Sequence, residues 1–353
     1  MSISRERIVA LVLVLWPLVA SAQGLKTQEE ITVERILIDA RVTDSHGEPL
    51  VGLTPSDFRV KVDGKLAVVE SVDWIPDTAA ARALSTIDES SAAAGDSAAM
   101  PAPNGRLFIY FFQTDFARNA ARVGGQMHLL ANVDGLVDSL EENDRVAVLS
   151  FDSRLKFRLD FSSDKAAIKH AMTEALSIDD PQRPQPVPNP SLATRLTPDA
   201  INNAQTCERA LLLLANALHP IAGPKSLILF GWGLGVRTRG SVQMTPEYAI
   251  ARHALESARV TVFSLDTTIA DYHDLELGLG KVAADTGGFY AKTHIFPQIA
   301  LERLEKTLTG HYELEVRKPD TKIVGVHTID VQTTKRGADV MARTSYIDQS
   351  KQP

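Results

Sequence analysis

The sequence of 353 residues contains a single cysteine, Cys207. One thiol excludes a disulfide within the chain and a cysteine-ligated zinc cluster. Basic residues are also scarce relative to acidic ones, since 37 Lys and Arg stand against 44 Asp and Glu, and the net charge is −7. A mildly acidic chain without a concentrated basic surface is not typical of nucleic-acid-binding proteins. We therefore expect no nucleic acid among its partners, and we expect Cys207 to be a buried, inert thiol.

Common catalytic motifs are absent as well. The nine histidines form no His-Glu-x-x-His motif, and no Gly-x-Ser-x-Gly nucleophile elbow occurs. Residues 231–235, Gly-Trp-Gly-Leu-Gly, lack the spacing and the Lys-Ser/Thr pair of a phosphate-binding loop. We therefore predict no cofactor and expect the histidines to be structural or surface residues.

The N-terminal segment has the features of a secretory signal peptide. Arg5 and Arg7 precede an apolar run over residues 8–20, and residues 20–22, Ala-Ser-Ala, supply the small side chains that a signal peptidase requires. The run is shorter than the about 20 residues that span a bilayer. We expect a signal peptide over residues 1–22 and an exported protein, periplasmic or extracellular, without a transmembrane segment after cleavage. An uncleaved N-terminal anchor is the alternative.

Two segments near the ends of the chain alternate polar and apolar residues, which is typical of half-buried strands. Within the first, Asp63-Gly64 predicts a hairpin turn, and Thr54-Pro55 predicts the start of a short helix. A small sheet of this kind needs a partner layer. We therefore expect residues 23–76 and 311–347 to form one smaller β-sandwich domain, followed by a tail at 348–353.

The middle of the chain has a different pattern. Residues 77–104 are rich in Ala, Ser, Asp and Pro and predict a flexible linker. Strands and helices then alternate over residues 105–310, and the continuous apolar run at 107–112 is typical of a strand buried on both faces. This alternation predicts an α/β domain with a doubly wound, mainly parallel sheet. We expect one long helix over about 118–142 and an irregular, proline-rich stretch at 180–198.

The order of several short motifs resembles that of the von Willebrand factor A (VWFA) fold, specifically the exported VWFA-related proteins of the acidobacterial type. The matching stretches are Val-Thr-Asp-Ser-His-Gly (42–47), Gly-Leu-Thr-Pro-Ser-Asp-Phe (52–58), Val-Asp-Gly-Lys (62–65), Asn-Asp-Arg-Val-Ala (143–147), Val-Thr-Val-Phe-Ser-Leu-Asp (260–266), Asp-Thr-Gly-Gly (285–288) and Asp-Val-Met-Ala-Arg-Thr-Ser-Tyr (339–346). The last stretch is similar to the family's V-R-A-R-x-G-Y ending, with Ser345 where Gly is usual. The resemblance covers nearly the whole chain after the leader, and it implies a Rossmann-like VWFA domain.

The resemblance also implies a metal-ion-dependent adhesion site. The family's site needs Asp-x-Ser-x-Ser after the first strand, a Thr in a later loop and an Asp after the fourth strand, because such hard oxygen ligands hold Mg²⁺ or Ca²⁺. Here Gln113 replaces the Asp, Asp115 the first Ser and Ala117 the second, while Gly231 and Trp232 stand where the later Asp is expected. Two threonines are candidates for the loop residue, Thr194 and Thr197. We expect a degenerate, metal-free site in which only Asp115 remains a weak candidate ligand.

Open α/β sheets place their ligands at the carboxyl ends of the strands. The residues that we expect to bind a partner there are Gln113, Thr114, Asp115, Trp232 and Arg237. An exposed tryptophan is typical of protein interfaces, so we expect non-enzymatic recognition of another exported or envelope protein. Two alternatives stay open: a hydrolase that uses the carboxylates of Asp115, Asp152 and Asp266, and a purely structural envelope protein.

The metal-free expectation predicts that the protein does not bind Mg²⁺ or Ca²⁺ with micromolar affinity, because too few hard oxygen ligands remain at the adhesion-type site. Isothermal titration calorimetry of the mature protein with each ion measures this. A micromolar affinity for either ion would overturn the expectation.

Overall fold

The computed structural model describes residues 34–83, 105–114, 117, 119–188, 190–239, 241–319, 323 and 325–348. The predicted signal peptide, Asp115 and most of the predicted linker lie outside the described residues. The linker's first part differs from the prediction, because residues 79–83 are helical. From Glu34 onward the described residues belong to one compact unit, and none of their helices is long and apolar enough to cross a bilayer.

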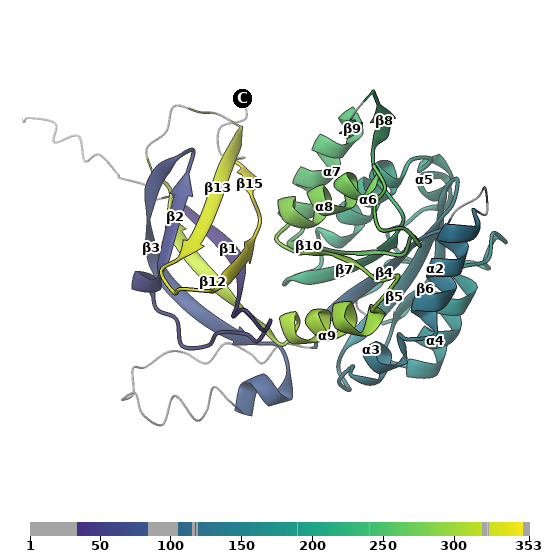
Figure 1. The fold of residues 1–353 in the computed structure, drawn as a ribbon, viewed down its shortest axis with the longest axis horizontal. Coiled ribbons are helices and arrows are strands. Elements are labelled where there is room, and N and C mark those ends of the chain that lie inside the picture. The colour runs from purple at the N-terminus through teal and green to yellow at the C-terminus, as the bar shows by residue number, and fades with distance from the viewer. Residues whose placement is uncertain are drawn as a thin grey trace, which may run out of the picture. The chain divides into compact units, whose positions relative to one another are not determined.

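Strands from both ends of the chain form one sheet of seven strands (Figure 1). Its members are β1 (Arg35–Thr43), β2 (Phe58–Val62), β3 (Lys65–Pro76), β12 (Gly310–Arg317), β13 (Val326–Thr333), β14 (Asp339–Ala342) and β15 (Ser345–Ile347). Their order is β14-β1-β12-β3-β2-β13-β15, and every neighbouring pair is antiparallel. Ile38 of β1 and Ile329 of β13 lie in distant strands yet share one core with Tyr312, so the sheet curls around its own apolar face.

The predicted β-sandwich is therefore a single curled sheet and not two facing sheets. The two ends of the chain do combine, but β12 lies between β1 and β3, and β13 pairs with β2. The hairpin of β2 and β3 has two open edges whose N–H and C=O groups need partners, and the C-terminal strands supply them. The short helix predicted at Thr54-Pro55 is confirmed as the 3₁₀ turn η1 (Pro55–Asp57) with Thr54 as its N-cap.

A second sheet has six strands, which all come from the part of the chain between β3 and β12. Its members are β4 (Leu107–Gln113), β5 (Arg145–Phe151), β6 (Leu155–Ser162), β7 (Lys225–Gly231), β10 (Val260–Asp266) and β11 (Tyr290–Lys292). The order is β11-β10-β7-β4-β5-β6, with all neighbours parallel except β5 and β6. The prediction of an α/β protein with a mainly parallel sheet is confirmed. Because parallel strands point the same way, the ends of β4, β7 and β10 meet at one edge, which we call the carboxyl edge.

Helices cover both faces of this sheet. They are α2 (Ala120–Leu130), α3 (Asp134–Asp138), α4 (Lys165–Glu174), α5 (Pro198–Asn203), α6 (Cys207–Leu218), α7 (Pro246–Ser257), α8 (Glu276–Asp285) and α9 (Pro297–Thr307), and a small hairpin of β8 (Val236–Thr238) and β9 (Ser241–Gln243) follows β7. Along β4, Ile109 and Phe111 enter the core shared with α6, α7 and α8, whereas Phe108, Tyr110 and Phe112 enter the core shared with α2, α3, α4 and α9. This alternation explains the continuous apolar run, because both faces of β4 are buried.

The single helix predicted over 118–142 is two helices, α2 and α3. The chain leaves the first helix near Asn132, whose side-chain amide donates to the carbonyl oxygen of His128 at 2.8 Å. Asparagine disfavours a helix interior because its side chain competes for backbone hydrogen bonds. The apolar spacing that suggested one helix continues across the break, since Leu129 and Leu136 pack into the same core.

Side chains connect the curled sheet to the α/β part. Arg259 follows α7 with a left-handed backbone, φ 52°, which is uncommon for a residue other than glycine. Its Nε donates to Asp39 of β1 at 2.9 Å, and its Nη2 contacts Glu313 of β12. Ser345 of β15 donates a hydrogen bond to the buried carboxylate of Glu256 in α7 at 2.6 Å. Charged and polar groups thus connect the two parts, and Met341 of β14 adds an apolar contact by packing into the core of the α/β part.

Glu256 predicts a pH dependence of stability. Burial raises the pKa of its carboxyl group from 4.5 to about 7, against the opposing effects of the Ser345 hydrogen bond and nearby arginines. A group whose pKa is raised on folding stabilises the fold fully below pH 4.5, and that contribution is lost as the pH rises through about 7. We predict that Glu256→Gln removes up to about 3 kcal/mol of the decline in unfolding free energy between pH 5 and pH 8. Urea unfolding of both proteins at each pH measures the difference, and identical pH profiles would contradict the prediction.

Candidate functional site

Gln113 ends β4 at the carboxyl edge, and only 4% of its surface is exposed. Its Nε2 donates to the carbonyl oxygen of Gly233 at 2.7 Å, while its Oε1 accepts from the backbone N–H groups of Trp232 at 3.0 Å and Gly233 at 3.1 Å. A single amide therefore satisfies a buried carbonyl and two buried or half-buried N–H groups of the loop that follows β7. Gln113 holds the ends of two neighbouring strands together.

These bonds decide whether the edge fits an adhesion-type metal site. A carboxylate at position 113 could not donate to the Gly233 carbonyl, whereas the amide that is present offers no negative charge to a cation. Ala117 has no side-chain oxygen, and Gly231 and Trp232 bring no carboxylate after β7. Among the described residues, the set at this edge does not fit Mg²⁺ or Ca²⁺, which prefer several charged oxygen ligands.

The two candidate threonines of the proline-rich region form hydrogen bonds within their own segment. Thr194 donates from Oγ1 to the carbonyl oxygen of Ser191 at 3.2 Å, and Thr197 caps α5 by accepting from the N–H of Ala200 at 3.3 Å. Both hydroxyls therefore stabilise the fold of their own segment. No described contact brings either of them to Gln113.

Thr114, the neighbour of Gln113, is also buried, with 3% of its surface exposed. Its hydroxyl donates to the carbonyl oxygen of Ala175 at 2.8 Å, and Gln126 of α2 donates to the backbone oxygen of Gln113 at 2.6 Å. Neither Gln113 nor Thr114 presents its side chain to solvent. We therefore revise their expected role from direct partner contact to support of the surrounding loops.

Trp232 and Arg237 lie nearer the surface. The Trp232 ring is half-buried, with the guanidinium carbon of Arg122 3.6 Å from its centre, close enough for a cation–π interaction. Arg237 of β8 has 74% of its side chain exposed and donates to Asp274 at 2.5 Å. Trp232 thus packs against Arg122 of α2, and Arg237 connects the β8–β9 hairpin to the loop after β10.

Two carboxylates of the hydrolase alternative, Asp152 and Asp266, do not converge, while Asp115 lies outside the described residues. Asp152 follows β5 and pairs with Lys156 at 2.7 Å, whereas Asp266 ends β10. Since β4 and β7 lie between those strands, three spacings of about 4.8 Å put the two carboxylates roughly 14 Å apart. Carboxylate pairs that hydrolyse glycosides are about 5–9.5 Å apart. Burial alone would raise the pKa of Asp152, but the bonds from Lys156 and Ser153 lower it overall, so this residue is an ion-pair partner.

Asp266 belongs to a saturated network at the carboxyl edge. It accepts from the Tyr290 hydroxyl at 2.7 Å and lies 2.7 Å from His273 Nε2, while the nearby Glu276 pairs with Lys292 at 2.7 Å. Ligand atoms of Asp266, His273 and Glu276 lie within 4.8 Å of one another, as a metal site would require. The histidine nitrogen that faces the carboxylates is itself bonded to Asp266, however, and Glu276 is paired with Lys292, so this group is explained as a hydrogen-bonded ion-pair cluster.

Sequence reasoning missed a group of large apolar side chains near the same edge, which we call the apolar patch. Its six members are between 49% and 65% exposed, and they are Met127, Ile269, Tyr272, Ile295, Phe296 and Ile299. They come from α2, from the loop after β10 and from the start of α9 with the loop before it. No regular spacing connects these positions in the sequence. The only local signal is the apolar pair 295–296 directly before the proline that opens α9.

Hydrogen bonds hold the segments of the apolar patch beside one another. The N–H of Ile269 donates to the carbonyl oxygen of Ala121 in α2 at 3.2 Å. The loop after β10 meets the loop before α9 where Asp271 and His294 lie 3.3 Å apart. Helix α9 returns to the end of α2 through a bond of 2.7 Å from Gln298 to Asn132. The three segments therefore form a closed ring of neighbours.

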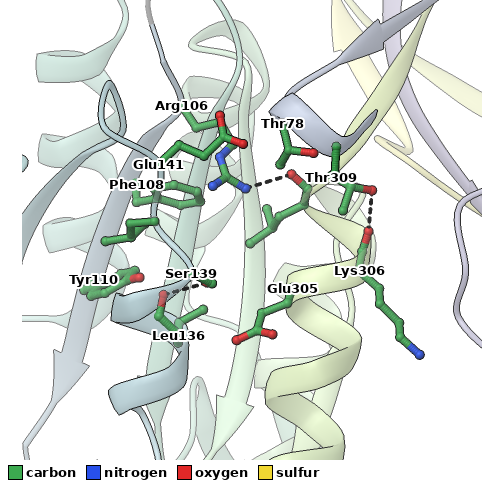
Figure 2. A pocket seen from close by; sticks show the side chains of 13 residues that line it. Thr78, Arg106, Phe108, Tyr110, Leu136, Ser139, Glu141, Glu305, Lys306 and Thr309 are labelled. Atoms are coloured by element: carbon green, nitrogen blue, oxygen red, sulfur yellow. Dashed lines mark hydrogen bonds between the residues drawn. The ribbon is translucent and has the colours of Figure 1, made fainter. Parts of the chain in front are cut away.

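A cavity of about 320 Å³ lies at the opposite edge of the sheet, next to the starting end of β4 (Figure 2). Phe108 and Tyr110 line it together with two carboxylates, those of Glu141 and Glu305. Both oxygens of Glu141 are engaged, one by the N–H of Ala79 at 2.6 Å and one by Arg82 at 3.0 Å. Burial, together with the nearby Glu302, raises the pKa of Glu305. The cavity therefore offers one available carboxyl group and not a catalytic pair.

The hydrogen bonds of Gln113 predict that a carboxylate at this position lowers the unfolding free energy. In Gln113→Glu an oxygen replaces the N–H donor that lies 2.7 Å from the Gly233 carbonyl oxygen, so two acceptors face each other in a buried site. We predict a loss of about 1–3 kcal/mol in unfolding free energy at pH 7, measured by urea unfolding. The exposed Gln243→Glu is the matched control and should change little. Equal effects of the two substitutions would show that the Gln113 bonds are not important.

No protein-family model and no curated protein matches the chain. Among solved structures, it is similar to proximal thread matrix protein 1 from the mussel byssus with a zinc-occupied MIDAS motif (TM-score 0.41, 17% identity, 61% of this chain and 48% of that one). It is also similar to BatB from Bacteroides thetaiotaomicron (0.38, 15%, 57% and 98%) and to human Sec24c of the COPII coat (0.40, 11%, 69% and 44%). The chain thus spans less than half of the matrix protein and of Sec24c. Similarities of this size do not assign a family or an activity.

Proposed function

We propose that this chain is an exported, non-enzymatic VWFA-like module that recognises another exported or envelope protein at the carboxyl edge of its doubly wound sheet. Its adhesion-type metal site is degenerate and binds no divalent cation. The observation that carries the proposal is the apolar patch, because six large apolar side chains that are each about half exposed or more need a partner surface to leave water.

The composition of the apolar patch supports protein recognition. Phe, Tyr and Met are enriched in protein interfaces, and charged residues are depleted from their centres. Isolated surface hydrophobic residues need no explanation, whereas grouped ones mark interaction sites, and the segments that carry these six are neighbours joined by hydrogen bonds. The partner segment that fits this surface is aliphatic or aromatic. Recognition by apolar contacts needs no bridging metal, which agrees with the loss of the metal ligands at Gln113 and Ala117.

The loops that carry the apolar patch are held on a rigid scaffold. A side-chain carbon at Gly125 of α2 would lie only 1.6 Å from the carbonyl oxygen of Thr267, so the helix packs closely on the loop after β10. On the other side, the pair of Arg237 and Asp274 fixes the same loop. Loops positioned in this way are the usual carriers of binding residues. Trp232 and Arg237 flank the apolar patch in this proposal and contact the rim of the partner.

Two isoleucines allow a matched test of the binding surface. Ile299 of α9 belongs to the apolar patch and is 65% exposed, whereas Ile250 of α7 is 60% exposed and does not belong to it. We predict that Ile299→Gln weakens capture of the partner from the native envelope at least tenfold, which corresponds to about 1.4 kcal/mol. Ile250→Gln should capture it as the wild type does. Quantitative affinity capture with the mature protein, followed by titration of the enriched partner, measures both.

The outcomes separate the candidate functions. If both variants lose the same partner, or if neither variant loses it, the binding surface lies elsewhere. A second comparison with Trp232→Ala tests the rim contact, provided that circular dichroism shows a folded variant. If wild-type protein cross-linked in its native envelope yields no specific partner, the purely structural alternative replaces this proposal.

A further inference from the structure

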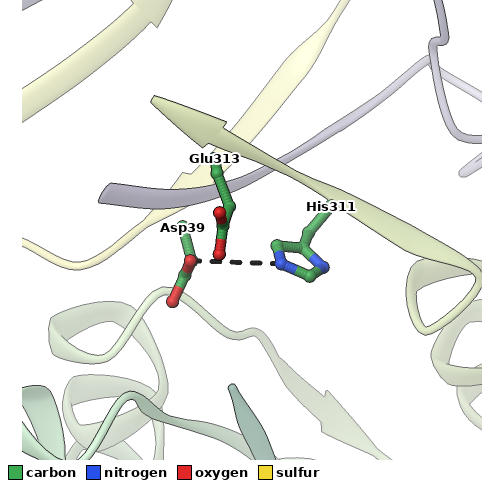
Figure 3. A group of neighbouring side chains, drawn as sticks. All are labelled: Asp39, His311 and Glu313. Atoms are coloured by element: carbon green, nitrogen blue, oxygen red, sulfur yellow. Dashed lines mark ion pairs between the residues drawn. The ribbon is translucent and has the colours of Figure 1, made fainter. Parts of the chain in front are cut away.

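Three side chains that could bind a metal ion lie together on the face of the curled sheet opposite its apolar core. They are far in the sequence from Gln113 and the adhesion-type site. Asp39 of β1 and Glu313 of β12 are directly paired across neighbouring strands, and His311 precedes Glu313 by two residues, so it emerges on the same face. One ligand atom from each lies within 4.8 Å of the other two. Figure 3 shows the three side chains converging. Regular strands fix all three positions, which is the placement that precise metal sites use.

A fourth residue orients the histidine ring. Asp77 accepts from His311 Nδ1 at 2.9 Å, with the carboxylate on the side of the ring away from the cluster. The other nitrogen, Nε2, lies 4.0 Å from Asp39 Oδ1. Metal-binding histidines commonly donate one ring N–H to a carboxylate in this manner, which leaves the second nitrogen free to bind the metal.

His311 Nε2 has no hydrogen-bond partner within the part of the chain that the structure describes, although the His311 side chain is only 1% exposed. Buried polar atoms are usually paired. Nitrogens of His294 and His327 also have no partner among the described residues, but of these three histidines only His311 has ligand atoms of two carboxylates within 4.8 Å. If the ring is neutral with its proton on Nδ1, a bare acceptor faces two carboxylates. If Nε2 carries a proton as well, the distance of 4.0 Å to Asp39 is too long for a hydrogen bond. Either state leaves one buried group unsatisfied.

Arg259 occupies part of this space. Its guanidinium contacts both carboxylates and offsets one of their two negative charges, but no bond joins it to His311. One negative charge of the cluster therefore stays uncompensated by Arg259, and Nε2 stays without a hydrogen bond. Its side chain is 28% exposed and borders a cavity of about 500 Å³, so it has room to turn away from Asp39 and Glu313.

We propose that Asp39, His311 and Glu313 form a site for a first-row divalent cation of the Zn²⁺ type, which competes with the Arg259 guanidinium for the two carboxylates. One imidazole nitrogen and two carboxylate oxygens suit zinc better than Mg²⁺ or Ca²⁺. Zinc ligands at about 2.0–2.2 Å from the ion lie roughly 3.4 Å from one another, so a small inward movement of the three side chains completes the set. Water fills the remaining positions.

Metal binding at this site would replace the ion pairs of Arg259 with Asp39 and Glu313 by bonds from the cation to the three ligands. Arg259 belongs to the α/β part, whereas all three ligands belong to the curled sheet. A bound cation releases the guanidinium and so removes a charged contact between the two parts. The cation therefore acts on the junction and not on the apolar patch.

Zinc affinity of four proteins tests the proposal, measured by competition with a chromophoric chelator. The wild type should bind one zinc ion, and His311→Gln should bind at least tenfold more weakly. Arg259→Gln should bind at least tenfold more tightly, because the competing cation is gone. His273→Gln is the matched control, since His273 sits in the other group of two carboxylates and a histidine but already has its partner, and it should bind like the wild type.

The same affinities can overturn the proposal. Wild-type affinity in His311→Gln, or weaker binding in His273→Gln alone, would place zinc elsewhere. Unchanged affinity in a folded Arg259→Gln would refute the competition. Should circular dichroism show that Arg259→Gln does not fold, X-ray absorption of the zinc-loaded wild type decides, with one imidazole and otherwise oxygen ligands expected. A zinc shell with two or more imidazoles would reject the site.

Discussion

Pro76 and Gly310 are paired residues on neighbouring strands, so the chain leaves the curled sheet and returns to it at one place. The pairing continues one step further, because the N–H of Asp77 donates to the carbonyl oxygen of Thr309 at 2.8 Å. Gly310 is required there, since a side-chain carbon would lie 2.4 Å from the Trp74 ring. The entire α/β part is thus inserted through a narrow, hydrogen-bonded neck, and the rest of the architecture depends on it.

A single neck makes side-chain contacts important for the junction of the two sheets. Arg259 reaches the curled sheet from the end of α7, and the Ser345 hydroxyl reaches Glu256 in the opposite direction. These groups are buried or half-buried, so each unpaired charge would be costly. At the other end of the α/β sheet a neutral amide has the corresponding task, because Gln113 joins β4 to the loop after β7. The connection at that edge is a hydrogen-bonded crosslink.

Local patterns in the sequence predict a good part of this fold. The apolar run at 107–112 predicts a strand buried on both sides, and the turn at Asp63-Gly64 predicts the hairpin of β2 and β3, because both signals come from neighbouring residues. The curled sheet was not predictable in the same way. Periodicity tells which face of a strand is apolar, but the insertion of β12 between β1 and β3 depends on pairing between residues far apart in the chain.

The candidate site was predictable only as a region. The rule that α/β sheets bind at their carboxyl edge indicates the loops that carry the candidate site, but Gln113 and Thr114 are buried and form hydrogen bonds to residues more than 60 positions away. The apolar patch depends on three separate segments, so no window of sequence contains it. His311 and Glu313 share a strand face by simple alternation, yet their meeting with Asp39 needs the register of β1 against β12.

The position of the first and last described strands has a mechanical consequence. Since β1 and β15 both belong to the curled sheet, tension applied at these two ends acts directly on that sheet, and it reaches the α/β part through the neck and through the contacts of Arg259 and Ser345. The apolar patch takes part in none of these contacts, because its residues lie on α2, on the loop after β10 and around the start of α9. Tension between the two ends of the curled sheet therefore acts first on its strand pairing and not on the apolar patch.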